Sequence, residues 1–207
     1  MLSLNKPLQE FSKLDKCLSK YGTYFEYADE KQIVYSNDAN QGDTFVILDG
    51  LISLRRGENV LMGITQAPFI MGIADGVMKN DIEYKLVTES RCTGYFLPSS
   101  HAIKILEQHQ LWREAFCWLA WENRTLELRD LQLIGNNSYD QIRATLIAMV
   151  DWDEGLRARI GVMNYIHQRT RISRSVVAEV LAALRKGNYI EMKKGKLVNI
   201  NHLPSEY

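Results

Sequence analysis

Cationic side chains near the C-terminal end are the chemically most informative residues of this sequence. Residues 156–207 contain ten Lys or Arg against three acidic residues, a net charge of +7, and residues 1–155 therefore carry −7. A basic segment on an acidic body is typical of a module that binds a polyanion such as nucleic acid. A solvated basic face explains the same charge equally well, so the local pattern must decide.

A helix is predicted to begin after Ser173 and to end at Gly187, because serine is a good N-cap and glycine commonly follows a helix. One face of this helix is apolar and is formed by Val177, Val180 or Leu181, and Leu184. The opposite face carries small and polar residues, namely Arg174, Ser175, Ala178, Ala182 and Arg185. Small side chains beside an N-terminal arginine suit insertion into the major groove of DNA.

A hairpin with a basic tip is predicted to follow this helix. Residues 188–192 and 196–200 alternate as strands, and Lys193, Lys194 and Gly195 form the tip between them. A short helix over residues 162–168 and a tight connection over residues 169–172 precede the Ser173 helix. The series predicts a winged helix-turn-helix in which the wing lysines contact phosphate. A helical hairpin that binds protein is the alternative.

The N-terminal half has a different pattern. Between residues 32 and 97, short apolar runs are separated by turn residues, which predicts a compact antiparallel barrel or jelly roll. The runs are residues 44–48, 51–55, 60–64, 69–73, 83–88 and 92–97. Asp49-Gly50 predicts a hairpin between the first two runs, with a type I′ turn. A short helix is expected around residues 8–19.

Residues 100–135 are predicted to form one long helix. Apolar and polar residues recur there every three or four positions, which gives a stripe for packing: Phe116, Leu119, Asn123, Leu126, Asp130 and Leu133. The stripe fits a partner helix across a dimer axis, and it fits equally well a helix lying on its own barrel. Residues 135–138 break the pattern and a second helix is expected over residues 139–150. The predicted domains are therefore residues 1–99, 100–135 and 136–207, in an α+β chain.

Several classes of function are not favoured by the sequence. Cys17, Cys92 and Cys117 lie far apart, which argues against a disulfide framework and a metal or iron–sulfur site, although a redox-sensing role for one of them stays open. No catalytic constellation, metal site or cofactor site is recognised. We expect no membrane span and no signal peptide, and hence a cytoplasmic protein.

The chain resembles a known family of regulators. Residues 172–177, 184 and 187–190 resemble the recognition-helix pattern S-R-x-T-V-x-R-x-L-x-x-L…G-L-I of the cAMP receptor protein/FNR regulators. Residues 42–50 look like that family's barrel motif G-D-x-x-[FY]-x-[IV]-x-x-G, and residues 100–135 stand where it has a dimerisation helix. The resemblance covers nearly the whole chain. It implies a cyclic-nucleotide-binding-like antiparallel β-barrel (jelly roll), a long dimerisation helix and a winged helix-turn-helix.

The chain departs from this family at the nucleotide pocket. Gly72 matches the pocket glycine, but Ile73 replaces the glutamate that binds ribose. Ile82 and Glu83 align with the arginine and small hydroxyl residue that bind the phosphate. A carboxylate repels an anionic phosphate, so we expect no cAMP or cGMP binding.

The recognition segment also departs from the family. Glu179 replaces a second base-reading arginine, and Arg171 replaces the glycine of the turn. We therefore expect docking to be retained while the preferred DNA sequence differs.

The expected function is that of a homodimeric regulator that binds an inverted repeat in double-stranded DNA, with RNA polymerase as a further partner. An adaptor that uses the winged helix to contact RNA polymerase or another regulator is the alternative. The base-reading residues are predicted to be Ser173, Arg174, Ser175, Ala178, Glu179 and Arg185. The phosphate-binding residues are predicted to be Arg169, Arg171, Lys193, Lys194 and Lys196.

Overall fold

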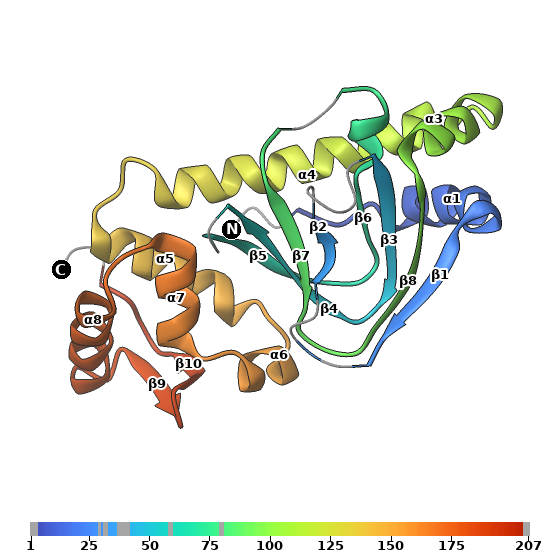
Figure 1. Cartoon of the computed structure of the whole chain (residues 1–207). Coiled ribbons are helices and arrows are strands. Elements are labelled where there is room, and N and C mark those ends of the chain that lie inside the picture. The colour runs from blue at the N-terminus through green and yellow to red at the C-terminus, as the bar shows by residue number, and fades with distance from the viewer. Residues whose placement is uncertain are drawn as a thin grey trace. The chain divides into compact units, whose positions relative to one another are not determined.

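The computed structural model of the chain describes residues 4–28, 30, 33–36, 42–57, 60–78 and 81–204. It forms two compact units, residues 1–125 and residues 126–207 (Figure 1). The division falls inside one helix, α4 (Trp112–Leu133), and not after residue 135. The last two turns of α4 thus belong to the C-terminal unit.

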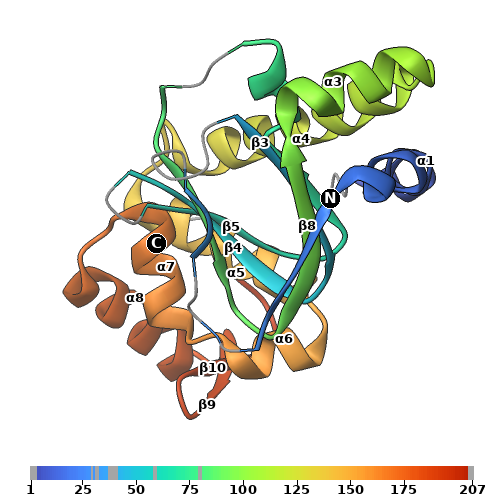
Figure 2. The same ribbon diagram turned by 45° about the vertical axis from the view of Figure 1, so that its right-hand side comes forward.

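The N-terminal unit is built on eight antiparallel strands, in agreement with the predicted jelly roll. They are β1 (Thr23–Tyr27), β2 (Ile33–Ser36), β3 (Asp43–Asp49), β4 (Leu51–Arg56), β5 (Val60–Gln66), β6 (Phe69–Met71), β7 (Tyr84–Thr88) and β8 (Cys92–Pro98). One sheet has the strand order β1-β8-β3-β6 and the other β2-β7-β4-β5 (Figure 2). The two sheets do not close into a barrel. Both contribute buried side chains to one core, among them Ile47, Ile52 and Leu86.

The predicted hairpin at Asp49 and Gly50 is wrong. Strand β3 pairs with β6 and β8, whereas β4 pairs with β5 and β7, so the two residues carry the chain from one sheet to the other. Of the two, only Gly50 has a positive φ, of 107°. A Cβ atom on Gly50 would lie 2.4 Å from the carbonyl oxygen of Arg91. The glycine therefore serves a close backbone approach and not a type I′ turn.

Two features of the helices also differ from expectation. The segment expected as one helix over residues 100–135 forms α3 (Ser99–Gln108) and α4, with a break at which Gln110 has a φ of 55°. Helix α1 (Leu8–Leu18), close to its predicted range, packs against α4. Phe11 lies 5.7 Å from Trp118 between ring centroids, and Lys13 Nζ lies 2.8 Å from Glu114 Oε1. The short 3₁₀ helices η1 (Ser19–Tyr21) and η2 (Ile73–Gly76) complete the unit.

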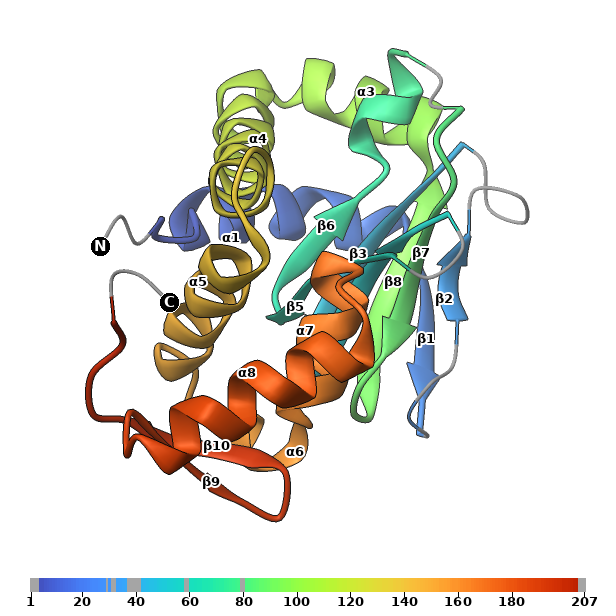
Figure 3. The same cartoon turned by 90° about the vertical axis from the view of Figure 1, so that its left-hand side faces the viewer.

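The C-terminal unit contains four further helices and a two-stranded sheet (Figure 3). They are α5 (Ser138–Val150), α6 (Glu154–Arg159), α7 (Val162–Thr170) and α8 (Arg174–Lys186), followed by β9 (Ile190–Lys193) and β10 (Lys196–Ile200). Helix α5 buries Ile142, Leu146 and Met149, as its spacing predicted. No helix over the described residues combines the length and apolar character that crossing a bilayer requires.

Candidate nucleic-acid interface

Helices α7 and α8 and the turn between them form the predicted helix-turn-helix. Ser173 caps α8, because its Oγ accepts a hydrogen bond from the Val176 amide at 3.4 Å. Inside the turn, the Ile172 carbonyl accepts a hydrogen bond from His167 Nδ1 at 2.8 Å, and the Ile172 amide donates to Thr170 Oγ1 at 3.2 Å. Both backbone groups of Ile172 are therefore satisfied within the turn, which fixes the direction in which α8 leaves it.

Helix α8 has two chemically distinct faces. Val177, Val180, Leu181 and Leu184 are buried, in agreement with the predicted apolar face. The other side is exposed and carries every residue predicted to read bases: Ser173 at the cap, then Arg174, Ser175, Ala178, Glu179 and Arg185. Arg174 and Arg185 are eleven residues apart, which separates them by about 16 Å along the helix axis. Only the N-terminal end of a recognition helix contacts base edges, so Arg185 lies beyond that end.

The wing follows α8 as a tight hairpin. Lys193 pairs with Lys196 across the two strands, and the turn residues Lys194 and Gly195 have φ angles of 49° and 76°. Two positive φ angles in succession are the property of a type I′ turn, which joins two strands without splaying them. The Gly195 carbonyl also accepts a hydrogen bond from the Val162 amide at 3.0 Å, which attaches the tip to the start of α7. The side chains of Lys193 and Lys194 are exposed at this tip.

Two residues that were predicted to bind phosphate have hydrogen-bond partners within the protein. Arg169 is only 9% exposed, and its guanidinium donates to Gln132 Oε1 at 2.5 Å and to the Tyr165 hydroxyl at 3.2 Å. It lies on the buried side of α7, one turn after Tyr165, so in this conformation its guanidinium is engaged within the protein. Lys196 is half-buried and its ammonium donates to the Arg159 carbonyl, which occupies one of its three donors.

The structure adds residues that the sequence analysis missed. Helix α6 was not predicted, although its N-cap Asp153, which accepts a hydrogen bond from the Leu156 amide at 3.0 Å, is a recognisable start signal. Arg157 in this helix donates from Nη1 to the Val198 carbonyl at 3.2 Å and so holds the second strand of the wing. Asn188, and not Gly187, adopts the left-handed conformation after α8, with a φ of 57°.

The residues expected to align with the family's nucleotide pocket include a glycine, an isoleucine and a glutamate, namely Gly72, Ile73 and Glu83. Gly72 has a φ of 90°, and a Cβ there would lie 2.3 Å from the Asp43 carbonyl oxygen, so the glycine of the motif is retained for close packing. Ile73 is buried. The Glu83 carboxylate is paired with Lys85 Nζ at 2.5 Å, and Asp75 Oδ2 accepts a hydrogen bond from the Tyr35 hydroxyl at 3.2 Å.

Aromatic rings occupy the space between the two sheets near these positions. Phe45 lies at the centre of the group, with ring centroids 5.2 Å from Phe96, 5.5 Å from Tyr35 and 6.0 Å from Phe25. Tyr27 extends the group beyond Phe25 at 5.3 Å. These contacts are typical of a packed core.

The three cysteines are free thiols in the structure: Cys92 is buried, and Cys17 and Cys117 are half-buried. Burial raises the pKa of the Cys92 thiol, which disfavours the reactive thiolate. Over the part of the chain that the structure describes, no three His, Cys, Asp or Glu residues are grouped as a metal site requires.

Comparison with known proteins identifies the family. A family model described as winged helix-turn-helix DNA binding matches residues 138–205. Proteins named inhibitor of hydrogen peroxide resistance match over the full length of both chains, with 74% identity in Escherichia coli K12 and 70% in Salmonella typhimurium. The chain belongs to this family.

Solved structures place the fold among the CRP/FNR regulators. The c-di-GMP responsive global regulator CLP of Xanthomonas campestris aligns with a TM-score of 0.76 and 13% identity, over 92% of this chain and 99% of CLP. A CRP-family transcriptional regulator from Thermus thermophilus aligns with a TM-score of 0.64 and 14% identity, over 86% and 92% of the two chains. These likenesses show the fold, and the C-terminal residues 138–205 match a winged helix-turn-helix DNA-binding domain.

Proposed function

We propose that this family member is a homodimeric transcriptional regulator that reads an inverted repeat in double-stranded DNA and needs no cyclic nucleotide to do so. The observation that carries the proposal is the exposed face of α8, which is small and cationic, followed at once by a wing whose tip presents two lysines. A groove admits such a helix without steric conflict, and the wing neutralises phosphates beside it.

The exposed residues divide by the part of DNA that they would contact. Arg174 is in the first turn of α8, where a cation opposes the helix dipole, and a guanine edge or a phosphate would relieve that opposition. Ser173, Ser175, Ala178 and Glu179 would lie beside the bases, with Glu179 able to accept from a cytosine amino group. Among the predicted phosphate ligands, the exposed ones are Arg171, Lys193 and Lys194, and Arg185 joins them because of its distance from the start of α8.

The outer face of α4 supports a dimer. Phe116 is 72% exposed and Leu126 is 40% exposed, and Trp112 one turn earlier is 43% exposed. These residues and Leu119, Asn123 and Asp130 recur at alternating intervals of four and three along one side of the helix. That spacing is the seam of a two-helix coiled coil, and one polar position within it fixes the register. Leu133, the last residue of the predicted stripe, is buried within its own chain and is therefore not part of the proposed seam.

The jelly roll supports independence from cyclic nucleotides. The positions that would bind ribose and phosphate hold Ile73 and Glu83, and Asp75 adds a second carboxylate nearby in sequence. An anionic phosphate gains nothing from these groups, and aromatic rings pack around Phe45 in the core. Calorimetric titration with cAMP and cGMP tests this point: heat of binding at micromolar nucleotide would contradict it.

The relatives named inhibitor of hydrogen peroxide resistance suggest the regulated genes. We expect the DNA sites of this protein to lie at genes for hydrogen peroxide resistance, and mapping of its bound sites across the genome tests that expectation.

The decisive experiment compares two variants on two kinds of DNA. Arg174→Ala should lower the affinity for the best genomic fragment by about 1–3 kcal/mol and leave random duplex DNA nearly unaffected. Lys194→Ala should weaken both DNAs alike and reduce the slope of affinity against salt. Lys104→Ala, an exposed lysine on α3, serves as the control and should change neither.

Equal losses on both DNAs for Arg174→Ala would contradict its base-reading role. If gel shifts at physiological salt find no preferred genomic fragment at all, the chain is instead an adaptor that contacts RNA polymerase or another regulator.

A further inference from the structure

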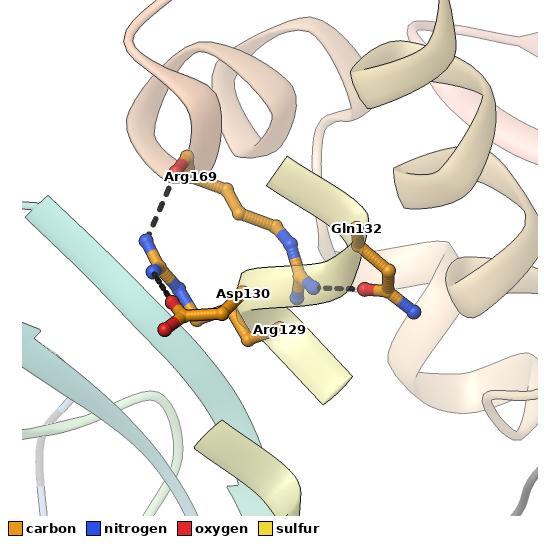
Figure 4. Close-up of polar contacts among 4 residues, drawn as sticks. All are labelled: Arg129, Asp130, Gln132 and Arg169. Carbon is orange, nitrogen blue, oxygen red and sulfur yellow. Dashed lines mark hydrogen bonds and ion pairs between the residues drawn. The ribbon is translucent and has the colours of Figure 1, made fainter. Parts of the chain in front are cut away.

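Two arginines link the end of α4 to the helix-turn-helix within the C-terminal unit (Figure 4). Arg129 in α4 donates from Nη2 to the backbone carbonyl of Arg169, at 3.4 Å, in the last turn of α7. Arg169 in turn donates from its own Nη2 to Gln132 Oε1, 2.5 Å away, one turn further along α4. The two helices are therefore joined in both directions. We refer to Arg129, Gln132 and Arg169 as the clamp.

The surroundings of Arg169 are costly for a charged group. Its side chain is about nine-tenths buried and its Nε has no hydrogen-bond partner. Within the described residues, no carboxylate lies within 4.0 Å of its guanidinium, which donates instead to the neutral groups of Gln132 and Tyr165. A buried cation held by neutral groups contributes little or nothing to stability, because desolvation opposes it. An apolar side chain of similar length would fill the same space.

The geometry of the arginine explains its presence better than stability does. A guanidinium is a rigid planar fork, which holds two acceptors in a fixed relation. Arg169 holds Gln132 of α4 and Tyr165 of α7 at once, and Tyr165 is itself held against Trp152 by an edge-on ring contact at 4.8 Å. The clamp thus fixes the direction of α7 against the last turns of α4.

Arg169 lies immediately before the turn from which α8 begins. Only Thr170 and the turn residues 171–173 separate it from Arg174, and that turn is closed by the hydrogen bonds of Ile172. A change in the direction of α7 therefore changes the direction of α8 by a similar amount. We infer that Arg129, Gln132 and Arg169 position the recognition helix against the end of α4, and so set the half-site spacing that a dimer accepts. This inference rests on the proposed function.

Positioning makes a different prediction from a direct contact with DNA. Symmetric half-sites must match the separation of two recognition helices, so a loosened clamp should broaden the range of spacings that the dimer accepts. Binding to random DNA depends on phosphate contacts alone and should stay unchanged. The positioning residues would thus alter selectivity without altering the electrostatic part of the affinity.

The test uses the full-length protein and a duplex that the wild type selects from a random library. Its spacer is then lengthened or shortened by one and two base pairs, and a random duplex of equal length is measured beside it. The wild type should prefer the selected spacer by roughly tenfold or more. Arg169→Met should reduce this preference to about threefold or less, with unchanged affinity for random DNA and no loss of melting temperature. Gln132→Leu should reduce the preference in the same way but lower the melting temperature, because it leaves the buried guanidinium of Arg169 without one of its acceptors.

Two further variants serve as controls. Gln132→Glu keeps the acceptor for Arg169 and should keep the spacing preference. Arg56→Met, an exposed arginine on β4, should change nothing. A spacing preference that survives in Arg169→Met overturns the inference. If Arg169→Met instead weakens random DNA and lowers the salt slope by about one, Arg169 is itself a phosphate ligand and the positioning role is wrong.

Amide hydrogen exchange separates this inference from the proposed function, because it needs no DNA. Arg169→Met should accelerate exchange at residues 170–172, whose amides are hydrogen-bonded in α7 and the turn, and leave the amides of the buried α8 residues Val177, Leu181 and Leu184 protected. Unchanged exchange at residues 170–172 contradicts the positioning role of the clamp. A wild type that selects no duplex overturns the proposed function, whatever the exchange result.

Discussion

Glu122 offers a stability test whose size follows from its position in α4. Its carboxylate lies beside the fully buried Trp118, whose indole Nε1 donates to Glu122 Oε1 at 3.1 Å and to the Ile70 carbonyl at 3.3 Å. Burial raises the pKa of Glu122 to about 8, and the indole hydrogen bond acts in the opposite direction without cancelling the rise. Glu122→Gln keeps the shape of the side chain and removes the charge.

The sign and size of the effect follow from linkage. The ordinary pKa is 4.5, so below pH 4.5 the carboxyl is protonated in the folded and the unfolded chain and contributes no difference. Between pH 4.5 and about 8 the folded chain retains a proton that the unfolded chain releases, so stability falls as the pH rises. The full difference in pKa corresponds to an upper limit of about 5 kcal/mol, and relaxation around the carboxylate lowers it.

We therefore expect Glu122→Gln to match the wild type at pH 4 and to exceed its free energy of unfolding by roughly 1–4 kcal/mol at pH 9. Urea unfolding followed by tryptophan fluorescence, at pH values from 4 to 9, measures this difference. The pKa of Lys6, which burial lowers to about 8, gives the profile a second contribution of opposite sign in alkaline solution. That contribution cancels when the two proteins are compared at the same pH.

Glu107→Gln on α3 is the control, because Glu107 is exposed, and its stability difference should stay small across the series. A difference for Glu122→Gln that does not change with pH, or a wild type that is the more stable protein at pH 9, would refute the assignment of a buried, neutral carboxyl.

Three further predictions test the turn, the dimer face and the sheet corner. Arg171 has a φ of 65°, so Arg171→Gly should be more stable to urea than Arg171→Ala by about 1 kcal/mol, while both weaken DNA binding to the same extent; equal stabilities would argue against strain in the turn. Phe116→Glu should convert the dimer to monomers in sedimentation, whereas Tyr24→Glu, on β1 and also exposed, should not; an unchanged dimer would remove Phe116 from the interface. Gly50→Ala should lower the free energy of unfolding by about 2–4 kcal/mol, against about 1 kcal/mol for Gly57→Ala, where the added Cβ meets nothing within 4 Å. Similar losses in thermal unfolding would argue against the close approach of Gly50 to the Arg91 carbonyl.

Local chemistry explains which elements were predictable. The bounds of α8 agree with the prediction because the cap at Ser173 and the apolar spacing of Val177, Leu181 and Leu184 are properties of consecutive residues. The wing was predictable for the same reason, since its strands are adjacent and Lys194-Gly195 closes them with a two-residue turn. Both features depend on contacts between near neighbours in the sequence.

Pairing between distant strands was not predictable in the same way. Asp49-Gly50 has the composition of a hairpin turn, yet β3 pairs with strands that come later in the sequence, and that choice depends on the whole core. Strand β1 was missed because none of the residues Thr23–Tyr27 is fully buried, so the segment lacks the apolar run by which the other strands were predicted. In both places the local signal was outweighed by contacts that a single sequence does not display.

The basic segment shows why a count of charges overestimates a DNA-binding surface. Several of its ten cations are engaged within the protein, among them Arg169 in the clamp, Arg157 on the Val198 carbonyl, and Lys196 on the Arg159 carbonyl. The last two hold the second strand of the wing, so they serve DNA binding by shaping the hairpin that presents Lys193 and Lys194. A positive charge that appears from the sequence to be one uniform patch therefore has two functions. Some cations build the winged helix, and the proposed phosphate contacts rest on exposed ones such as Lys193 and Lys194.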